Sequence, residues 1–398
     1  MINAAILGFG TVGSGVAEVI EGNNAQVSKA AGDQVSLKYI LDVREISGTP
    51  FDEKVIHDFS IIELDPEVNV VIETIGGATI AYEYTSRALA AGKSVVTSNK
   101  ELVATHGYEL IRMAEEHGVN YLFEASVGGG IPILHPINTC LGANQITEIV
   151  GILNGTTNYI LTRMIKDGIS FEDALAEAQA NGYAERNPAA DVEGPDACRK
   201  ICILASLAFG RHIYPDQVPT EGITKITLAD VSCAEKAGCR VKLLGRAVPR
   251  GDGLVCAYVA PHLVPEENPL ANVKGVFNAI TVVGNAVGAT MYYGQGAGKL
   301  PTASAVVADV IDIARNGDRG TIMSWEDGGD DTTYSTDELS NRWYVRASGP
   351  AVPAGAELLS APEDENAVFL TEAAMTRPEL DALLKQAGTV PAFVMRVL

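Results

Sequence analysis

Charged side chains are concentrated in residues 181–200, which read NGYAERNPAADVEGPDACRK. The charged residues considered first are Glu185, Asp191, Glu193, Asp196 and Lys200. Residues 201–210, ICILASLAFG, follow directly and are almost entirely apolar. Charges at the mouth of a buried helix are costly unless they bind something. We therefore expect this stretch to form part of a binding site.

Two of these residues have the spacing of neighbours on one helix face. Pro195 is tolerated in a first helical turn, so a helix should begin near Asp196. Asp196 and Lys200 are then four residues apart on that helix. The simplest alternative is an ordinary surface salt bridge, worth about 0.2–0.5 kcal/mol. The helix continues for ten residues without a polar face, which favours a functional ion pair.

A second chemical signal is the glycine pattern at the start of the chain. Gly8, Gly10 and Gly13 lie between a predicted buried strand, residues 2–7, and a helical pattern. Such glycines allow a tight turn, close approach of the backbone to a pyrophosphate, and packing of helix on strand. The N-terminus of the helix adds free N–H groups for the phosphates. The pattern predicts a dinucleotide site.

Further strands are predicted in a regular rhythm, with helical patterns between several of them. The strands are 35–41, 68–74, 93–99 and 120–126, and the helical patterns include 81–92 and 107–118. This alternation predicts a parallel, doubly wound sheet, whose ligands gather at the carboxyl ends of its strands. The residues at those ends are Thr74, Gly76, Gly77, Ser98, Asn99, Lys100 and Glu124. A surface lysine at a helix start is the alternative interpretation of Lys100.

The choice between the two nicotinamide dinucleotides is open from these residues. Asp42 ends the second predicted strand and is suited to the ribose hydroxyls of NAD. Arg44 follows two residues later and is suited to the 2′-phosphate of NADP.

Composition limits the class of protein. The 398 residues are 47% hydrophobic and carry a formal charge of −21, which argues against nucleic acid or an anionic membrane as partner. The six cysteines are scattered without a C-x-x-C pair, so we expect reduced thiols and no zinc site. No run approaches the roughly 18 apolar residues of a membrane span, and residues 1–10 lack the features of a signal peptide. We therefore expect a cytoplasmic protein with neither nucleic acid nor a membrane as its partner.

The pattern changes after about residue 133, where a second domain is expected. Residues 148–168 read as a strand, a polar turn at 154–158 and a helix. Ser170 begins a capping-box pattern with Asp173, and the helix after it ends at Gly182. The remaining predictions are a loop over 183–194, strands over 221–229, 241–248 and 254–260, a hairpin over 278–298, and a helix over 302–315 that returns to the first domain.

Six stretches of the sequence resemble the homoserine dehydrogenase family. They are GFGTVGSGV, TSNKELVA, FEASVGGGIPI, GILNGTTNYIL, GYAERNPAADVEGPDACRK and YYGQGAGKLPTASAVV, and they run in the family's order over about residues 2–315. The resemblance implies an NAD(P)-dependent oxidoreductase that interconverts L-homoserine and L-aspartate 4-semialdehyde in threonine, methionine and isoleucine biosynthesis. It also implies a homodimer or a higher homo-oligomer.

The implied fold is α/β, with a Rossmann-like doubly wound parallel sheet, a mixed α/β catalytic and dimerisation domain, and a small α+β C-terminal module. We place the NAD(P)-binding domain at 1–132, completed by a returning helix at 302–322, and the catalytic domain at 133–301. An acidic linker is expected at 325–340. Residues 341–398 contain a strand, a hairpin around 356–372, a helix and a last strand, which is typical of a short ACT-like module.

The resemblance also implies roles for individual residues. Lys200 is similar to the family's proton donor, and Lys100 to its second catalytic lysine. Residues implied in substrate binding are Glu185, Asp196, Asp191, Gly155, Thr156 and Tyr183. Residues implied in cofactor binding are Gly8, Phe9, Gly10, Thr11, Val12, Gly13, Arg44, Thr74, Gly76, Ser98, Lys100, Gly182 and Gly298. A sodium site is implied at Glu124 and at the backbone carbonyls of Val127, Gly129 and Ile131.

Two alternative functions would require different residues in the sequence. An acylating semialdehyde dehydrogenase needs a nucleophilic cysteine, and Cys198 lies between Asp196 and Lys200 without the partner histidine of such chemistry. A non-catalytic regulator with the same fold is expected to lose the lysines and carboxylates, which this chain retains.

Overall fold

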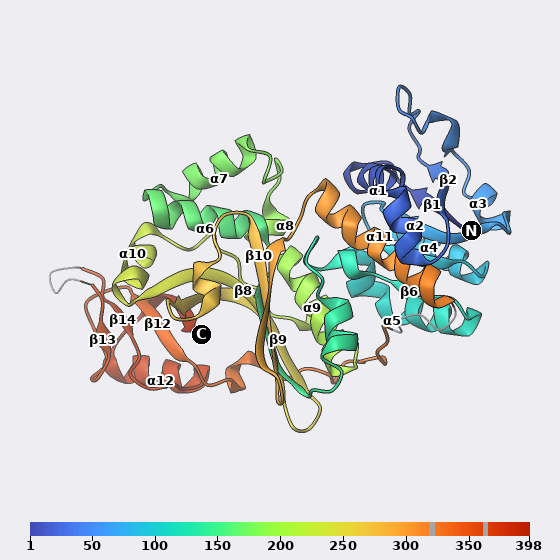
Figure 1. The fold of residues 1–398 in the computed structure, drawn as a ribbon. Helices are drawn as coiled ribbons and strands as arrows, with labels where there is room; N and C mark the ends of the chain where they lie inside the picture. Colours follow the sequence, from blue (N-terminus) through green and yellow to red (C-terminus); the bar gives the residue numbers. More distant parts are fainter. Residues whose placement is uncertain (318–322, 361–364) are drawn as a thin grey trace. The chain divides into compact units, whose positions relative to one another are not determined.

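The computed structural model describes residues 1–317, 323–360 and 365–398, and the chain forms two compact units (Figure 1). The first unit comprises Met1–Thr147, Cys202–Pro215 and Val283–Asp330. The second comprises Glu148–Ile201, Asp216–Val282 and Asp331–Leu398. None of the helices in the described ranges is both long enough and apolar enough to span a bilayer.

A six-stranded parallel sheet forms the centre of the first unit. Its strands, in spatial order, are β3 (Val55–Ile56), β2 (Val35–Leu41), β1 (Ile2–Leu7), β4 (Val68–Glu73), β5 (Ser94–Thr97) and β6 (Tyr121–Leu122). The central strands are buried along nearly their whole length, as expected when helices cover both faces of a parallel sheet. The predicted Rossmann-like sheet is therefore confirmed.

The last predicted strand, 120–126, is wrong in length. After β6 the chain forms a short 3₁₀ turn over Glu124–Ser126. The reason is that the backbone N–H of Glu124 donates to the carboxylate of Asp309, at 2.9 Å, in place of a neighbouring strand.

Helices connect the strands of the first unit. They are α1 (Thr11–Gly22), α2 (Asn24–Ala31), α3 (Ser60–Leu64), α4 (Thr79–Ala90), α5 (Lys100–His117) and α11 (Lys299–Asn316). The predicted helix over 302–315 lies within α11, and α11 runs beside α1 and α2 (Figure 1). Arg315 near its end donates to the carbonyl of Ala30, at 2.6 Å, which fixes α11 on α2. Residues 318–322 of the predicted returning segment lie outside the described residues.

The second unit is built on most of a nine-stranded mixed sheet. The strands, in spatial order, are β11 (Gly288–Gln295), β10 (Phe277–Gly284), β7 (Ile146–Ile152), β8 (Cys239–Pro249), β9 (Val255–Pro265), β15 (Pro391–Val397), β12 (Arg342–Ala347), β14 (Val368–Leu370) and β13 (Glu357–Leu358). The last strand of the chain, β15, pairs in parallel with β9 and antiparallel with β12. The C-terminal segment thus continues the same sheet, and its ACT-like identity stays a prediction.

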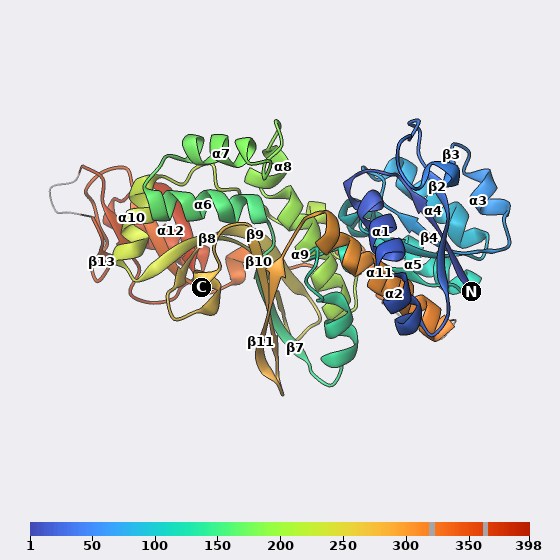
Figure 2. The same cartoon turned by 45° about the horizontal axis from the view of Figure 1, so that its top comes forward.

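The helices of the second unit are α6 (Gly155–Asp167), α7 (Phe171–Ala180), α8 (Ala189–Val192), α10 (Leu228–Lys236) and α12 (Arg377–Ala387), together with the start of α9 (Pro195–Phe209). Helices α6 and α7 lie side by side (Figure 2). As predicted, Ser170 caps α7 by accepting from the Asp173 N–H. Helix α12 packs Leu380 and Leu384 against Trp343 and Phe369 of the sheet.

Three local predictions for this unit are wrong. The polar turn at 154–158 is the cap and first turn of α6, because the Asn154 side chain accepts from the Thr157 N–H. The loop over 183–194 contains the single turn of α8. The strand over 221–229 is absent from the structure, because Thr227 and Asp230 form a capping box that starts α10 at Leu228.

Candidate active site

A buried ion pair lies at the start of α9 in the second unit. The ammonium of Lys200 donates to Asp196 Oδ2 at 2.7 Å and to the carbonyl of Leu153 at 2.8 Å. Lys200 is 7% exposed and Asp196 is 6% exposed. The predicted spacing of four residues is therefore a buried contact, and the surface salt bridge considered as an alternative is excluded.

Asn154 joins this pair to a second carboxylate. Its side-chain nitrogen donates to Asp191 Oδ1 at 2.7 Å and to Asp196 Oδ2 at 2.9 Å. The other end of the amide is fixed, because its oxygen accepts from the N–H of Thr157 at 2.9 Å. The N-cap of α6 thus orients the amide so that both of its hydrogens point at the two carboxylates.

The Asn154, Asp191, Asp196 and Lys200 side chains, called here the acid–lysine cluster, have an excess of negative charge when ionised. Burial raises the pKa of Asp191, and the nearby Asp196 adds to the rise, while Asn154 and Lys200 oppose it. Two carboxylates that face the same space can both accept from a cationic ligand, so the cluster is suited to bind a primary ammonium.

Two further residues of the predicted substrate set support the cluster from α6. The Thr156 hydroxyl donates to the carbonyl of Tyr183 at 2.7 Å, which holds the loop after α7 against the first turn of α6. Gly155 leaves no room for a side chain, since a Cβ there would lie 2.6 Å from the carbonyl oxygen of Val276.

The remaining predicted residues of this unit are on the loop after α7. Gly182 ends that helix with a φ of 73°, and Tyr183 is 45% exposed. The Glu185 side chain is exposed, and its carbonyl accepts from the Gln179 amide.

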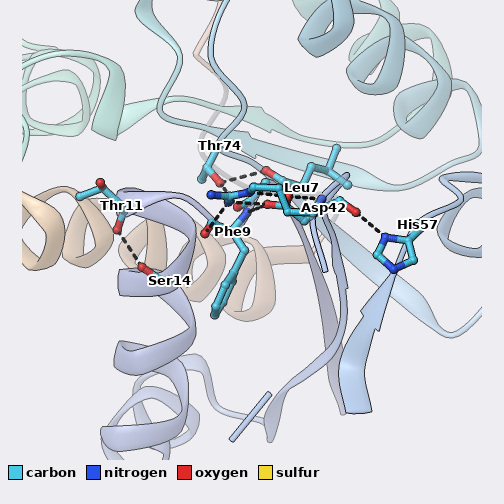
Figure 3. A network of polar contacts seen from close by, with 9 residues as sticks. Leu7, Phe9, Thr11, Ser14, Asp42, His57 and Thr74 are labelled. Carbon is cyan, nitrogen blue, oxygen red and sulfur yellow. Dashed lines mark hydrogen bonds and ion pairs between the residues drawn. The ribbon is translucent and has the colours of Figure 1, made fainter. Parts of the chain in front are cut away.

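The predicted phosphate-binding loop lies between β1 and α1 of the first unit. Gly13 must be glycine, because a Cβ there would lie 2.0 Å from the Gly8 carbonyl oxygen and 2.8 Å from Thr74 Oγ1. The Thr74 hydroxyl donates to the carbonyls of Leu7 and Gly8, which fixes this loop against the end of β4 (Figure 3). Gly10 caps α1 without a side-chain hydrogen bond, and Thr11 and Val12 form its first turn. Because glycine has no side chain, Gly10 gives no capping hydrogen bond to the first N–H groups of α1, which are the groups that bind phosphate in such loops.

The end of β2 carries the residues that bear on the choice of dinucleotide. Asp42 Oδ2 accepts from the N–H of Phe9 at 2.7 Å and from Arg44 Nη2 at 2.9 Å. Asp42 Oδ1 accepts from the N–H and from Nε of Arg44, both at 2.9 Å. Mainly because of the Arg44 guanidinium, the pKa of Asp42 is held well below its usual range. His57 Nδ1 lies 2.7 Å from the Asp42 carbonyl (Figure 3).

Other predicted cofactor residues lie at strand and helix ends of the same unit. Gly76 follows β4, and Ser98 follows β5. Lys100 is the first residue of α5 and is partly buried. Gly298 caps α11 with a φ of 126°.

The predicted sodium loop follows β6. The Glu124 carboxylate is buried and accepts the N–H groups of Ile133, Leu134 and His135 at 2.6–3.0 Å. Val127 and Ile131 are buried, and Gly129 has a φ of 56°. Within the described ranges, no three His, Cys, Asp or Glu side chains are grouped as a metal site.

Sequence reasoning missed the bridging role of Asn154. The signal was present, because an asparagine directly before an apolar helical pattern is a typical N-cap. Its contact with Asp191 and Asp196 depends on the fold of segments about 40 residues apart in the sequence, which no local pattern specifies.

Two sequence models of one family match most of the chain. The model described as homoserine dehydrogenase matches residues 132–311, and the model described as its NAD-binding domain matches residues 8–124. The homoserine dehydrogenase of Pseudomonas aeruginosa is 46% identical over 319 residues, which cover 79% of this chain and 72% of the relative. That of Bacillus subtilis is 43% identical over 319 residues, covering 79% and 73%.

Solved structures agree with the sequence comparisons. The crystal structure of a homoserine dehydrogenase from Thiobacillus denitrificans superposes with a TM-score of 0.89 at 33% identity, covering 100% of this chain and 98% of that one. A hyperthermophilic archaeal homoserine dehydrogenase mutant in complex with NADPH superposes with a TM-score of 0.65 at 28% identity, covering 78% and 97%. This chain therefore belongs to the homoserine dehydrogenase family.

Proposed function

We propose that this protein catalyses the reversible, NAD(P)-dependent interconversion of L-homoserine and L-aspartate 4-semialdehyde, with Lys200 as the proton donor and acceptor. The observation that carries the proposal is the acid–lysine cluster, which combines a buried ammonium with two carboxylates, Asp196 at the start of α9 and Asp191 on α8. The substrate is an amino acid, so it needs a receptor for its ammonium as well as a group that handles its hydroxyl proton.

The nicotinamide supplies the hydride chemistry when it is bound. The task of the protein is to handle the charge and the proton on the substrate oxygen. As the aldehyde is reduced, negative charge develops on that oxygen, and a lysine ammonium stabilises it and donates the proton. Lys200 is suited to this task because Asp196 and the Leu153 carbonyl hold its ammonium in one position. We assign Lys100 a second catalytic role, because it begins α5 directly after β5.

Substrate recognition follows from the charge of the cluster. Asp191 and Asp196 receive the substrate ammonium, because their carboxylate oxygens accept charge-assisted hydrogen bonds from a primary ammonium. Glu185 is included as a further ligand on the strength of the family resemblance alone, because its side chain is exposed.

The contacts of Asp42 favour NADP over NAD. An ionised carboxylate offers about four acceptor positions. Asp42 uses four: one for the N–H of Phe9 and three for Arg44. No acceptor position remains for a ribose hydroxyl, whereas the Arg44 side chain is 62% exposed and available to a phosphate. Arg44 therefore recognises the 2′-phosphate, and Asp42 holds Arg44 in place.

A monovalent cation is proposed in the loop after β6, bound by the carbonyls of Val127, Gly129 and Ile131. Oxygen-only ligands suit a hard cation. Three N–H groups occupy three of the roughly four acceptor positions of the Glu124 carboxylate, which leaves one position for the cation beside the three carbonyls. Replacing sodium by choline in the buffer is expected to lower the melting temperature; an unchanged melting temperature would remove the cation from the proposal.

A homodimer is proposed as the assembly. The edge strand β11 carries Met291 and Tyr293 at 42% and 53% exposure, and Val287, just before it, is 47% exposed. Exposed apolar side chains on an edge strand are typical of an interface. Sedimentation velocity with Tyr293→Lys tests it: the wild type should sediment as a dimer and the variant as a monomer.

The direct test of the function is a spectrophotometric assay of L-homoserine oxidation with NAD⁺ and NADP⁺ side by side. Growth of the reduced-nicotinamide band, faster with NADP⁺, is the expected result. Absence of the band with either cofactor would favour a non-catalytic regulator.

A further inference from the structure

A fully buried carboxylate lies in the middle of the parallel sheet of the first unit. Glu73 is the last residue of β4, is 0% exposed, and is paired across the sheet with Leu7 of β1 and Thr97 of β5. Its Oε1 accepts from the N–H of Ile75 at 2.6 Å, and its Oε2 accepts from the Thr97 hydroxyl at 2.5 Å. Glu73 thus connects the loop after its own strand to the end of the next strand.

Asn99 closes these contacts into a ring. The Thr97 hydroxyl accepts from the Asn99 N–H at 2.9 Å. The Asn99 amide nitrogen donates to the carbonyls of Ile75 at 3.1 Å and Gly77 at 2.7 Å. The Asn99 amide oxygen caps α5, whose first residue is Lys100. Glu73, Ile75, Asn99 and Thr97 therefore form one hydrogen-bonded ring, called here the Glu73 ring.

The Glu73 ring fixes the two loops that carry predicted cofactor and catalytic residues. Thr74 and Gly76 lie on the first loop, Ser98 lies on the second, and Lys100 begins the helix that follows the second loop. An ionisable group buried in a sheet is costly, so a purely structural role would be served more cheaply by an uncharged side chain. Its position between two ligand-binding strand ends indicates a positioning role.

We propose that Glu73, as a carboxylate, is a positioning residue that holds these two loops in the geometry that binds the dinucleotide and presents Lys100. The inference rests on the proposed function, since it assigns those loops to the cofactor and to catalysis.

The ionised form of Glu73 makes the ring stronger. A carboxylate accepts from the Thr97 hydroxyl and from the Ile75 N–H in charge-assisted hydrogen bonds, which are roughly twice as strong as neutral ones. A protonated Glu73 would instead donate to the second lone pair of the Thr97 oxygen, so the ring would stay closed through weaker, neutral hydrogen bonds. Burial raises the pKa of Glu73 to about 7, against the opposing effect of its hydrogen bonds from Thr97, Ile75 and Asn99.

One titratable group faces Glu73 from another strand. Tyr121 of β6 has a buried hydroxyl with no hydrogen-bond partner within the described ranges. Burial, with Glu73 as a further cause, raises the pKa of Tyr121 well above its usual value, so Tyr121 stays neutral wherever Glu73 titrates.

The test is the dissociation constant of NADP⁺, measured by titration calorimetry between about pH 6 and about pH 8. The 2′-phosphate of NADP⁺ ionises at about pH 6 and adds the same pH dependence to both proteins. Between about pH 6 and about pH 8, wild-type affinity should rise about ten-fold more than the affinity of Glu73→Gln, because only the wild type has a Glu73 carboxyl to ionise. Thr97→Val should bind NADP⁺ about ten-fold more weakly than Thr97→Ser, which keeps the hydroxyl and thus the ring. Thr85→Val, which removes a buried hydroxyl without a partner on α4, is the matched control and should follow the wild type.

The outcomes separate this inference from the proposed function. If Glu73→Gln shows the wild-type pH dependence, or if Thr97→Val binds as well as Thr97→Ser, the positioning role is wrong even though the enzyme oxidises homoserine. If the wild type binds NADP⁺ without oxidising homoserine, the proposed function fails and the ring is still tested by the binding data. A wild type that binds no NADP⁺ overturns both.

Discussion

The side-chain nitrogen of Asn154 lies 2.7 Å from Asp191 Oδ1, and the same nitrogen lies 2.9 Å from Asp196. One amide therefore bridges two carboxylates that would otherwise repel each other. Because the N-cap interaction with Thr157 fixes this amide, the start of α6 belongs to the proposed active site as well as to the helix.

The two functions of Asn154 can be separated by substitution. Asn154→Ser keeps a side chain that caps α6 but loses the bridge, so stability should be near that of the wild type, whereas the KM for homoserine should rise about ten-fold. Asn154→Ala loses both and should also be less stable by about 1 kcal/mol. Urea unfolding and steady-state kinetics check the pair. Equal KM values for Asn154→Ser and wild type would contradict the bridging role.

Arg44 should determine cofactor preference. Arg44→Ala removes the contact proposed for the 2′-phosphate and should raise the KM for NADP⁺ by about 10–100-fold. It also frees the two acceptor positions of Asp42 that the Arg44 side chain occupies, so the KM for NAD⁺ should stay level or fall. Arg112→Ala, on the exposed side of α5 in the same unit, is the control. A parallel loss with both cofactors would mean that Arg44 only supports the fold.

A buried lysine should make the free energy of unfolding depend on pH in the alkaline range. Lys242 is 2% exposed and donates to Asn158 Oδ1 at 3.0 Å, and burial lowers the pKa of Lys242 to about 7. The unfolded chain, with an ordinary lysine pKa, binds more protons than the folded chain between about pH 7 and about pH 10. The contribution of Lys242 to the free energy of unfolding should therefore increase as the pH rises through this range.

Lys242→Met removes this pH dependence, so the comparison with the wild type isolates it. Between about pH 7 and about pH 9.5, the free energy of unfolding of the wild type should rise relative to that of Lys242→Met by on the order of a few kcal/mol, as measured by urea unfolding. A constant difference between the two proteins over that range would show that Lys242 has an ordinary pKa.

Lys100 is predicted to act in catalysis. Lys100→Ala should lower kcat by about 10²-fold or more with the fold intact, as judged by circular dichroism. Lys93→Ala is not a suitable control, because Lys93 is buried and donates to the carbonyls of Asp65 and Val68. Lys29→Ala, near the end of α2, is the appropriate control and should turn over normally. Near-normal turnover of Lys100→Ala would remove Lys100 from the mechanism.

Much of the parallel-sheet unit could be predicted from sequence, because its signals are local. The glycine spacing of Gly8, Gly10 and Gly13 and the apolar strand runs each identify an element without knowledge of its neighbours. The Asp196–Lys200 pair was also accessible, because helix geometry alone fixes that contact.

The features that could not be predicted from the sequence depend on contacts between distant segments. The capping box of Thr227 and Asp230 outweighed the β-propensity of residues 221–229. The contact of Asp42 with Arg44 depends on the side-chain positions at the end of β2, so the sequence alone offered no ground for the proposed preference for NADP. Likewise, β15 joins β9 across more than 100 residues of sequence.

The most direct test of the central claim is kcat for homoserine oxidation by Lys200→Ala, with NADP⁺ affinity measured on the same preparation. Lys166→Ala, an exposed lysine of α6, is the control. The account predicts that Lys200→Ala loses about 10²–10⁴-fold in kcat while it binds NADP⁺ as the wild type does. A Lys200→Ala enzyme that turns over within a few-fold of the wild type would contradict the account.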